Sequence, residues 1–276
     1  MAYTTIDDPS AYFNSLIYTG NVTVRALTFD GNSDLAVDWI WLKSRSISGN
    51  HHLYDSVRGT QKHLRSNLDS AEGTNGGTDG VTAFSSNGVT IGTNTASNDD
   101  GETFVGWGWK AGTSFTNDAS GTGIGTIDSA GSVNTDAGFS IISFTGTETN
   151  SQSVAHGLGA VPELIISKSR DVADNWMVHH GSFSENDYIS LNLTNAKASA
   201  SSVWSSLPTS TVINIGDNAG VNDDGAMIMY AFRSVQGYSK FGSYTGNGNA
   251  DGTFVYTGFK TAFVMIKKTD SSGNYW

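Results

Sequence analysis

The chain of 276 residues contains no cysteine, only three prolines and few charged side chains, which make up 15% of it. Without cysteine, disulfide bonds cannot stabilise the fold, and thiolate metal, redox and nucleophile sites are excluded. No apolar run approaches the roughly 18 residues of a membrane-spanning helix, so we expect no membrane insertion. The net charge of −11 argues against nucleic acid as a partner, because phosphate binding needs a basic surface.

Small polar residues take the place of the missing charges, and glycine alone accounts for 33 positions. Serine, threonine, asparagine and glycine are unfavourable inside helices and favour turns. Aromatic residues still make up 11% of the chain, which supplies apolar surface for a core. We therefore predict an all-β fold with many tight turns. The opening residues lack the basic and apolar parts of a secretory signal, so we expect synthesis in a cytoplasm.

An internal repeat organises the chain. Tyr18-Thr19-Gly20, Phe144-Thr145-Gly146 and Tyr244-Thr245-Gly246 open three similar segments. Each segment leads to an apolar run that ends in a lysine: Lys43, Lys168 and Lys267. Matched landmarks in the same order at nearly constant spacing indicate duplication of one structural unit.

A second landmark lies later in the first two copies. Asn98-Asp99-Asp100-Gly101 recurs as Asn222-Asp223-Asp224-Gly225, and each precedes an aromatic strand. We predict that the two copies superpose, with Lys43 on Lys168 and Asn98 on Asn222. Seven or eight short strands in each unit suggest a two-sheet sandwich of jelly-roll or lectin-like type.

These landmarks divide the chain into five parts. They are an N-terminal leader or docking segment (1–13), a first β-sandwich repeat (14–112), a Gly/Ser/Thr-rich linker (113–138), a second β-sandwich repeat (139–236) and an incomplete third repeat (237–276). The leader is expected either to dock on a partner or to be an ordinary frayed terminus. The predicted fold is thus all-β, with tandem β-sandwich repeats.

The third copy contains too few strands to close a sandwich. We predict strands at Phe254–Tyr256 and Phe263–Lys267, and in the latter Phe263 and Met265 lie on one face while Val264 and Ile266 lie on the other. Left uncovered, such strands would expose large apolar side chains and open sheet edges. We therefore expect either that the chain continues beyond Trp276 or that a neighbouring chain completes the unit by strand addition.

The repeated acidic loops are candidates for calcium or glycan contact. They contain Asn98, Asp99, Asp100, Asn222, Asp223 and Asp224. Calcium needs several oxygen ligands, but the second loop has Ile228 where an EF-hand requires glutamate. Because Asx-Gly sequences commonly form hairpin turns, we interpret both loops as turns, and we expect no metal or other cofactor.

Trp107 and Trp109 lie on one face of a predicted strand and are candidate glycan-contact residues, since aromatic faces stack on sugars. The same spacing is typical of a core, which we favour.

The histidines are His51, His52, His63, His156, His179 and His180. Adjacent strand residues point to opposite faces, so the pairs form no chelate and a structural or surface role is expected. No nucleophile elbow and no distinct carboxylate pair is present, so we expect no enzymatic activity.

Several stretches resemble a family of repeat-containing proteins of tailed, often marine, bacteriophages. They are Ile6–Phe13, Leu53–Gly59, Trp107–Gly112 and Gly237–Gly248, together with the Tyr-Thr-Gly-Asn openings at Tyr18 and Tyr244. The resemblance covers almost the whole chain and implies a virion structural component, tail-fibre or adhesin-like, with no catalytic residues to transfer. The second copy has Asn175–His180 in place of Leu53–Gly59, so a site built on Asp55 and Arg58 would not be duplicated.

We therefore expect a bacteriophage virion protein, a tail fibre or other appendage that mediates attachment to a host-surface glycan. Its expected partners are other virion proteins, bound through the N-terminal segment, and further copies of itself in a homo-oligomer, most simply a trimer. The alternative is a capsid decoration or tail adaptor protein with no receptor role. A polysaccharide-degrading enzyme is the least favoured interpretation, because no paired carboxylate stands out.

Overall fold

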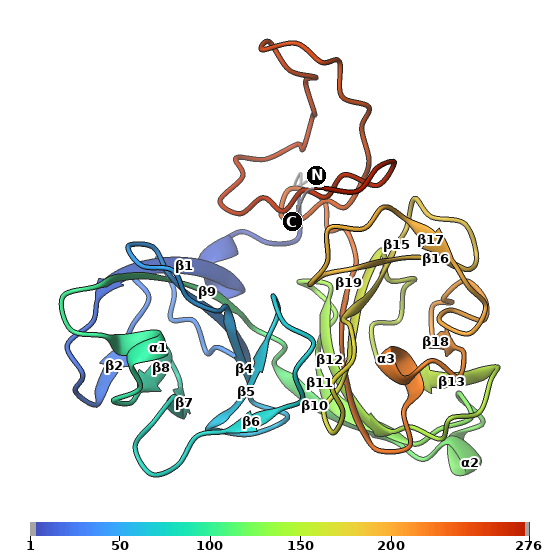
Figure 1. Cartoon of the computed structure of the whole chain (residues 1–276), viewed down its shortest axis with the longest axis horizontal. Coiled ribbons are helices and arrows are strands. Elements are labelled where there is room, and N and C mark those ends of the chain that lie inside the picture. Colours follow the sequence, from blue (N-terminus) through green and yellow to red (C-terminus); the bar gives the residue numbers. More distant parts are fainter. Residues whose placement is uncertain (1–3, 274–275) are drawn as a thin grey trace.

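The computed structural model describes residues 4–273 and 276, and nearly all of its regular structure is antiparallel β-sheet (Figure 1). The described helices are single turns: η1 (Pro9–Ala11), α1 (Thr95–Asn98), α2 (Ala119–Thr122) and α3 (Ala219–Asn222). The predicted all-β sandwich class is confirmed. Among the described residues, no helix has the length and apolar character needed to cross a bilayer.

The first unit is a sandwich of a large and a small sheet. The large sheet has the order β1 (Phe13–Thr19), β9 (Thr103–Trp109), β3 (Trp39–Ser44), β4 (His52–Asp55), β5 (Lys62–Arg65) and β6 (Gly73–Thr74). The small sheet has the order β2 (Arg25–Leu27), β8 (Gly88–Ile91) and β7 (Val81–Ser85). Between them lies an apolar core that includes Leu35, Ile40, Val89 and Phe104, each with no exposed surface.

The second unit has the same plan with a longer large sheet. Its order is β10 (Thr113–Asn117), β11 (Ser129–Asn134), β12 (Phe139–Thr145), β19 (Ala226–Phe232), β14 (Leu164–Ser169), β15 (Met177–His180), β16 (Asp187–Ser190) and β17 (Ala198–Ser199). The small sheet pairs β13 (Gln152–Ala155) with β18 (Val212–Ile215). A second core that includes Ile142, Val154, Ile165 and Met229 fills this sandwich.

The two units repeat one strand topology. The order β1-β9-β3-β4-β5-β6 recurs as β12-β19-β14-β15-β16-β17. Lys43 and Lys168 occupy the fifth position of β3 and β14, and each ammonium group donates to the backbone carbonyl of the following serine. Lys43 and Lys168 therefore occupy equivalent positions, as the repeat predicted.

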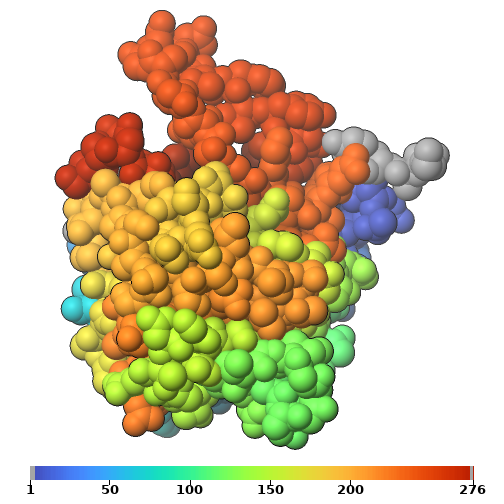
Figure 2. All heavy atoms as spheres, turned by 90° about the vertical axis from the view of Figure 1, so that its right-hand side faces the viewer, coloured from blue at the N-terminus to red at the C-terminus, as the bar shows by residue number. Residues whose placement is uncertain are grey.

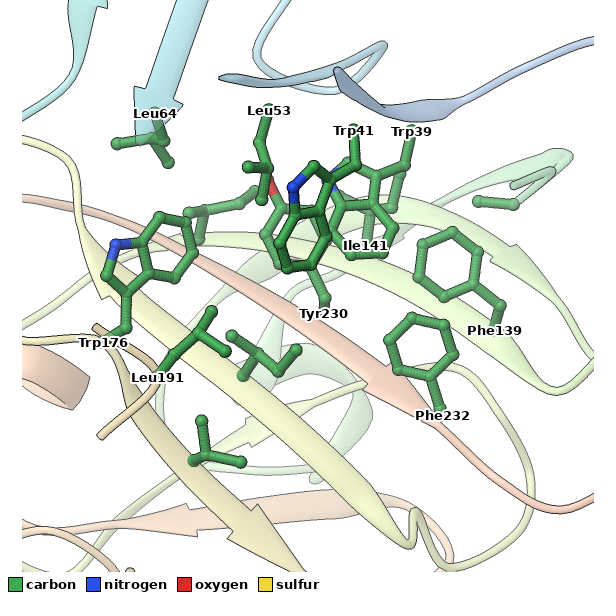
Figure 3. Packing of buried hydrophobic residues seen from close by; sticks show 14 of the residues in the cluster. Trp39, Trp41, Leu53, Leu64, Phe139, Ile141, Trp176, Leu191, Tyr230 and Phe232 are labelled. Carbon is green, nitrogen blue, oxygen red and sulfur yellow. The ribbon is translucent and has the colours of Figure 1, made fainter. Parts of the chain in front are cut away.

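The two large sheets pack face to face and enclose a third core, which the sequence did not predict (Figures 1 and 3). At its centre the rings of Trp39 and Tyr230 stack with centroids 4.5 Å apart. The rings of Phe139 and Phe232 stack beside them, also at 4.5 Å. The architecture thus has four layers, with a small sheet on each outer side.

Residues 113–138, which we expected to be a linker, instead contain β10, α2 and β11 and extend the second large sheet. Small side chains make this pairing possible. A Cβ on Gly131 would lie 1.9 Å from the backbone oxygen of Ile141, so only glycine fits there. The hydroxyl of Ser129 donates to the carbonyl of Ala155, which ties the added strand to the small sheet.

The third copy also differs from expectation, because no strand follows β19 in the described residues. The predicted strands at Phe254–Tyr256 and Phe263–Lys267 are absent, since no other described segment pairs with them. Residues 244–258 project from the body as a loop, with Phe254 85% exposed (Figures 1 and 2). Residues 262–267 lie against the sheets in extended form, with alternate side chains inward, as predicted for Phe263 and Met265.

The described part of the predicted leader packs on the first unit. The side chain of Ile6 is buried, and the carboxylate of Asp8 accepts a bond from the Ser10 N–H at the start of η1. The Tyr12 carbonyl accepts from the Lys110 N–H at 3.0 Å, which leads the chain into β1. Residues 1–3 of the predicted docking segment lie outside the described residues.

Two equivalent glycines mark a close approach of two backbone segments in each unit. A Cβ on Gly20 would lie 1.9 Å from the carbonyl oxygen of Asp99, and one on Gly146 would lie 2.0 Å from that of Asp223. We expect Gly20→Ala to lower the free energy of unfolding by about 2–4 kcal/mol, because backbone must shift to make room. Gly49→Ala is the control, since a Cβ there meets nothing within 4 Å. Urea unfolding measures both, and similar midpoints would contradict the assignment.

Candidate functional site

The side chains of the repeated asparagines join neighbouring loops by hydrogen bonds to their backbone. The amide nitrogen of Asn98 donates to the carbonyls of Thr23 and Gly92, and its oxygen accepts from the N–H of Asn21. Asn222 makes the equivalent three bonds, to Thr149, Gly216 and Thr147. Both side chains are fully buried, so neither is available to a ligand.

The acidic residues beside these asparagines are separated by their surroundings. Asp99 is half-buried, and Asp100 and Asp224 are exposed. Asp223 is buried and accepts a bond from the hydroxyl of Ser169 at 3.3 Å. Across residues 4–273 and 276, no group of three or more histidines and carboxylates is placed to hold a metal ion. Among the described residues, none of these acidic side chains lines the groove that Trp107 borders.

The two candidate tryptophans have different surroundings although they lie on the same face of β9. Trp109 packs among aromatic rings, 4.6 Å from Trp39 and 4.9 Å from Phe13 between centroids. Trp107 contacts Trp41 edge to face at 6.3 Å and Phe263 at 5.7 Å. Of these two candidates, only Trp107 lines a groove.

This groove lies where residues 262–266 and Trp276 cross the end of the core between the two large sheets, and it has a volume of about 430 Å³. Its lining consists of Trp41, His51, Ser66, Asn67, Trp107, Leu191, residues 262–266 and Trp276. Aromatic and aliphatic side chains provide most of the wall, and three polar side chains stand among them. A mostly apolar concavity with a few fixed polar groups is typical of a small-molecule or glycan site.

The polar side chains of the groove are held by hydrogen bonds. The indole N–H of Trp41 donates to His51 Nδ1 at 2.8 Å, and the His51 backbone N–H donates to the Asn67 side-chain oxygen at 3.0 Å. The Asn67 amide donates in turn to Asn50. Burial, aided by the charge of Lys43, lowers the pKa of His51 to about 4. His51 is therefore neutral at pH 7, with its proton on Nε2 because Nδ1 accepts.

A buried ion network crosses the interface between the two units. The Arg58 guanidinium bonds the carboxylate of Asp55 at 2.5 Å and that of Glu72 at 3.1 Å, all within the first unit. From the second unit, the hydroxyl of Tyr230 donates to Asp55 at 2.7 Å, and Arg170 makes two 2.9 Å bonds to Glu72.

In this network, the attraction between opposite charges offsets the cost of burying them. Burial alone would lower the pKa of Arg58, but Asp55, Tyr230 and Glu72 raise it well above its usual range. Burial raises the pKa of Glu72, and the bonds from Arg170 together with the charge of Arg58 lower it by more. Burial also raises the pKa of Tyr230, which keeps its proton for the bond to Asp55. Every charge in the network is paired, which is the condition for burying charges without a large penalty.

Sequence reasoning missed the network and most of the groove. Asp55 and Arg58 were noted only as a pair that the second copy lacks, Glu72 was not noted at all, and Tyr230 was treated only as part of an aromatic strand. One signal was present, since the stretch Leu53–Gly59 occurs in the first copy only. A motif that occurs in only one of two repeats indicates that this part of the two copies has different contacts. Here the motif of the first copy contacts the second copy.

Fold and site together define an all-β protein of two repeated sandwiches fused through a common face, with an aromatic groove at the end of their interface. Over residues 8–276 the chain matches a family described as a domain of unknown function, DUF7483, and it belongs to that family. No curated protein and no solved structure matches the chain.

The ion network predicts how much the hydroxyl of Tyr230 contributes to the stability of the fold. Tyr230→Phe removes the donor to Asp55 and leaves a buried carboxylate oxygen with fewer bonds, so we expect a loss of about 1–3 kcal/mol in the free energy of unfolding. Tyr188→Phe is the control, because the half-buried hydroxyl of Tyr188 has no hydrogen-bond partner in the described chain. Urea unfolding at pH 7 measures both variants. Equal losses would show that the Tyr230 bond contributes nothing specific.

The buried histidines predict the pH dependence of stability. Burial lowers the pKa of His52 to about 3 and that of His63 to about 4. Below pH 6.5 the unfolded chain gains protons that the folded chain does not, so stability is full above pH 6.5 and falls as the pH drops toward 4. We expect the destabilisation caused by His52→Leu to be smaller at pH 5 than at pH 7.5. Leu64→Val is the control, because it changes no titratable group. If the loss in free energy of unfolding caused by His52→Leu is as independent of pH as the loss caused by Leu64→Val, the prediction is wrong.

Proposed function

We propose that the chain is a virion protein of a tailed bacteriophage, a tail fibre or similar appendage, that binds host-surface glycans and is not an enzyme. It assembles into the virion through its N-terminal segment and as a homo-oligomer. The resemblance of its motifs to bacteriophage repeat proteins supports the virion assignment. The groove supports the binding role, and it is the observation on which the proposal rests.

Trp107 provides the apolar contact in this proposal. Its ring is half-buried, supported by Trp41 and Phe263, and one side borders the groove. The C–H face of a sugar ring packs on such a surface, while its hydroxyls require hydrogen-bonding groups at the rim. Ser66, Asn67 and the Nε2–H of neutral His51 are groups of this kind.

The charge of the protein narrows the ligand class. The chain has a net charge of −11, and the described residues that line the groove include no lysine or arginine. An acidic polysaccharide would be repelled at long range and would find no cation in the site. The proposed ligand is therefore a neutral glycan.

The placement of the carboxylates supports binding rather than hydrolysis. Asp55 has no exposed surface and is bonded to Arg58 and Tyr230, away from the groove lining. No aspartate or glutamate is among the described residues that line the groove. A glycosidase places two carboxyl groups on either side of the scissile bond, and the groove offers no such pair.

The test is glycan binding by the purified chain and by two Trp107 variants. We expect Trp107→Ala to weaken binding to neutral bacterial surface polysaccharides by about fivefold, which corresponds to about 1 kcal/mol of stacking. Trp107→Phe retains an aromatic face and most of the affinity. Titration calorimetry gives the affinities, and thermal unfolding verifies that each variant is folded.

Tyr244→Ala is the matched control, because Tyr244 is half exposed on the projecting loop and outside the groove. Equal affinities for Trp107→Ala and the unchanged chain would exclude the groove as the binding site. Gold labelling of the chain on intact particles tests the virion role separately. Label at the tail supports an appendage, whereas label on the capsid shell supports a decoration protein.

A further inference from the structure

The two large sheets differ at one edge, although their central strands are equivalent. In the second unit, β11 pairs with β12 from Phe139 to Phe144. In the first unit, β1 is the terminal strand of its sheet and pairs only with β9. One side of β1 is therefore open where the equivalent side of β12 is covered.

The bonds to β9 show which backbone groups face the open side. The Lys110 N–H donates to the Tyr12 carbonyl and the Gly20 N–H donates to the Glu102 carbonyl, so even-numbered residues of this stretch bond to β9. In an antiparallel ladder the alternate residues point their N–H and C=O groups the other way. The outward groups therefore belong to four residues: Phe13, Ser15, Ile17 and Thr19.

Local side chains satisfy only two of the outward backbone groups of this edge. The Ser15 N–H donates to the side-chain oxygen of Asn14, and the Arg25 guanidinium bonds the Thr19 carbonyl. In the described chain the backbone groups of Ile17 bond to nothing, and its side chain is 65% exposed. In the second unit the equivalent residue is Ser143, which pairs with Ala130 of β11.

The sequence before β1 explains why the edge is open. Asp8 caps η1 and Pro9 occupies its first position, which turns the chain just before β1. Residues 4–8 form no strand, so they do not pair with β1 as β11 pairs with β12 in the second unit. The sequence of β1, Phe-Asn-Ser-Leu-Ile-Tyr-Thr, contains no charge, proline or glycine. Proteins usually protect an edge with such residues, and this edge lacks them all.

We propose that β1 is an association edge, and that its occupant is β1 of a second copy of this chain. The two strands pair antiparallel about a twofold axis with Leu16 opposite Leu16. This register places Phe13 opposite Thr19 and Ser15 opposite Ile17, so all four outward residues of each strand find a partner. The two six-stranded sheets become one sheet of twelve strands.

Two observations favour the symmetric pair over another occupant. β1 contains no charged residue, so the symmetric pair places no like charges opposite each other, although each chain carries a net charge of −11. Centred on Leu16, the pairing uses the full length of β1, from Phe13 to Thr19, with no unmatched end. A twofold pair also differs from the trimer expected of a fibre, so the oligomeric state separates the two.

The first experiment changes the outward group of Ile17 alone. Ile17→Pro removes an N–H that β9 does not use, Ile17→Lys adds a charge to the edge, and Ile17→Thr is the neutral control. We expect the unchanged chain and Ile17→Thr to form dimers in sedimentation velocity runs across the micromolar range. Ile17→Pro and Ile17→Lys weaken dimerisation at least about tenfold, with thermal unfolding showing that both are folded. A monomeric or trimeric unchanged chain overturns the proposal.

The second experiment tests the register and uses the absence of cysteine from the chain. Leu16 opposes itself at a non-hydrogen-bonded position, where Cα atoms lie about 4.5 Å apart, within reach of a disulfide. Leu16→Cys should therefore form a covalent dimer on mild oxidation. Asn14→Cys is the control, because Asn14 would oppose Tyr18 and its copies would lie too far apart. Dimers that resist Ile17→Pro, or that crosslink equally through both cysteines, overturn the proposal, and a segment other than β1 is then the occupant.

Discussion

The stacking of Trp39 on Tyr230, with Asp55 bound beneath it, is the contact on which the arrangement of the whole molecule depends. Each repeat offers the same face of its large sheet, and burying both faces against each other makes a third core. This constraint explains why β3 is apolar on both sides: Ile40 and Leu42 fill the sandwich of the first unit, while Trp39 and Trp41 fill the space between units. A sheet exposed on one side would alternate apolar and polar residues instead.

The repeat landmarks were sufficient to predict the class of fold and the equivalence of Lys43 with Lys168, because they belong to strands and turns within each sandwich. They could not predict that the sandwiches face each other. The bond between Tyr230 and Asp55 joins residues 175 positions apart, and no periodicity along the chain encodes such a contact. Residues 113–138 were misinterpreted for a related reason. Small polar residues favour flexible segments, but Gly131 is required for close pairing of β11 with β12.

In the candidate site, too, the sequence pattern could not predict contacts between distant parts of the chain. Trp107 and Trp109 have identical spacing and strand position, and sequence reasoning could not separate them. They differ in what covers them: Trp109 is enclosed by Trp39, Phe13 and Phe263, whereas Trp107 borders a groove made partly by residues 262–266 and Trp276. Those residues form no strand of a third sandwich, and they come to the groove because alternate apolar side chains fit against the exposed end of the shared core.

Comparison of the two copies separates what the fold requires from what this protein adds. The lysine at the fifth strand position, the hydrogen-bonded asparagine and the close glycine are present in both units, and each acts within its own sandwich. The copies differ on the shared face and at the edge, where Asp55 of β4 corresponds to His180 of β15 and Trp107 corresponds to Tyr230. A fused pair of identical units would have a symmetric interface. Placing Tyr230 where the first copy has Trp107 lets one unit donate a hydroxyl to a carboxylate of the other, while Trp107 remains at the groove. The same divergence that fixes the two units together therefore leaves Trp107, and not Tyr230, at the groove.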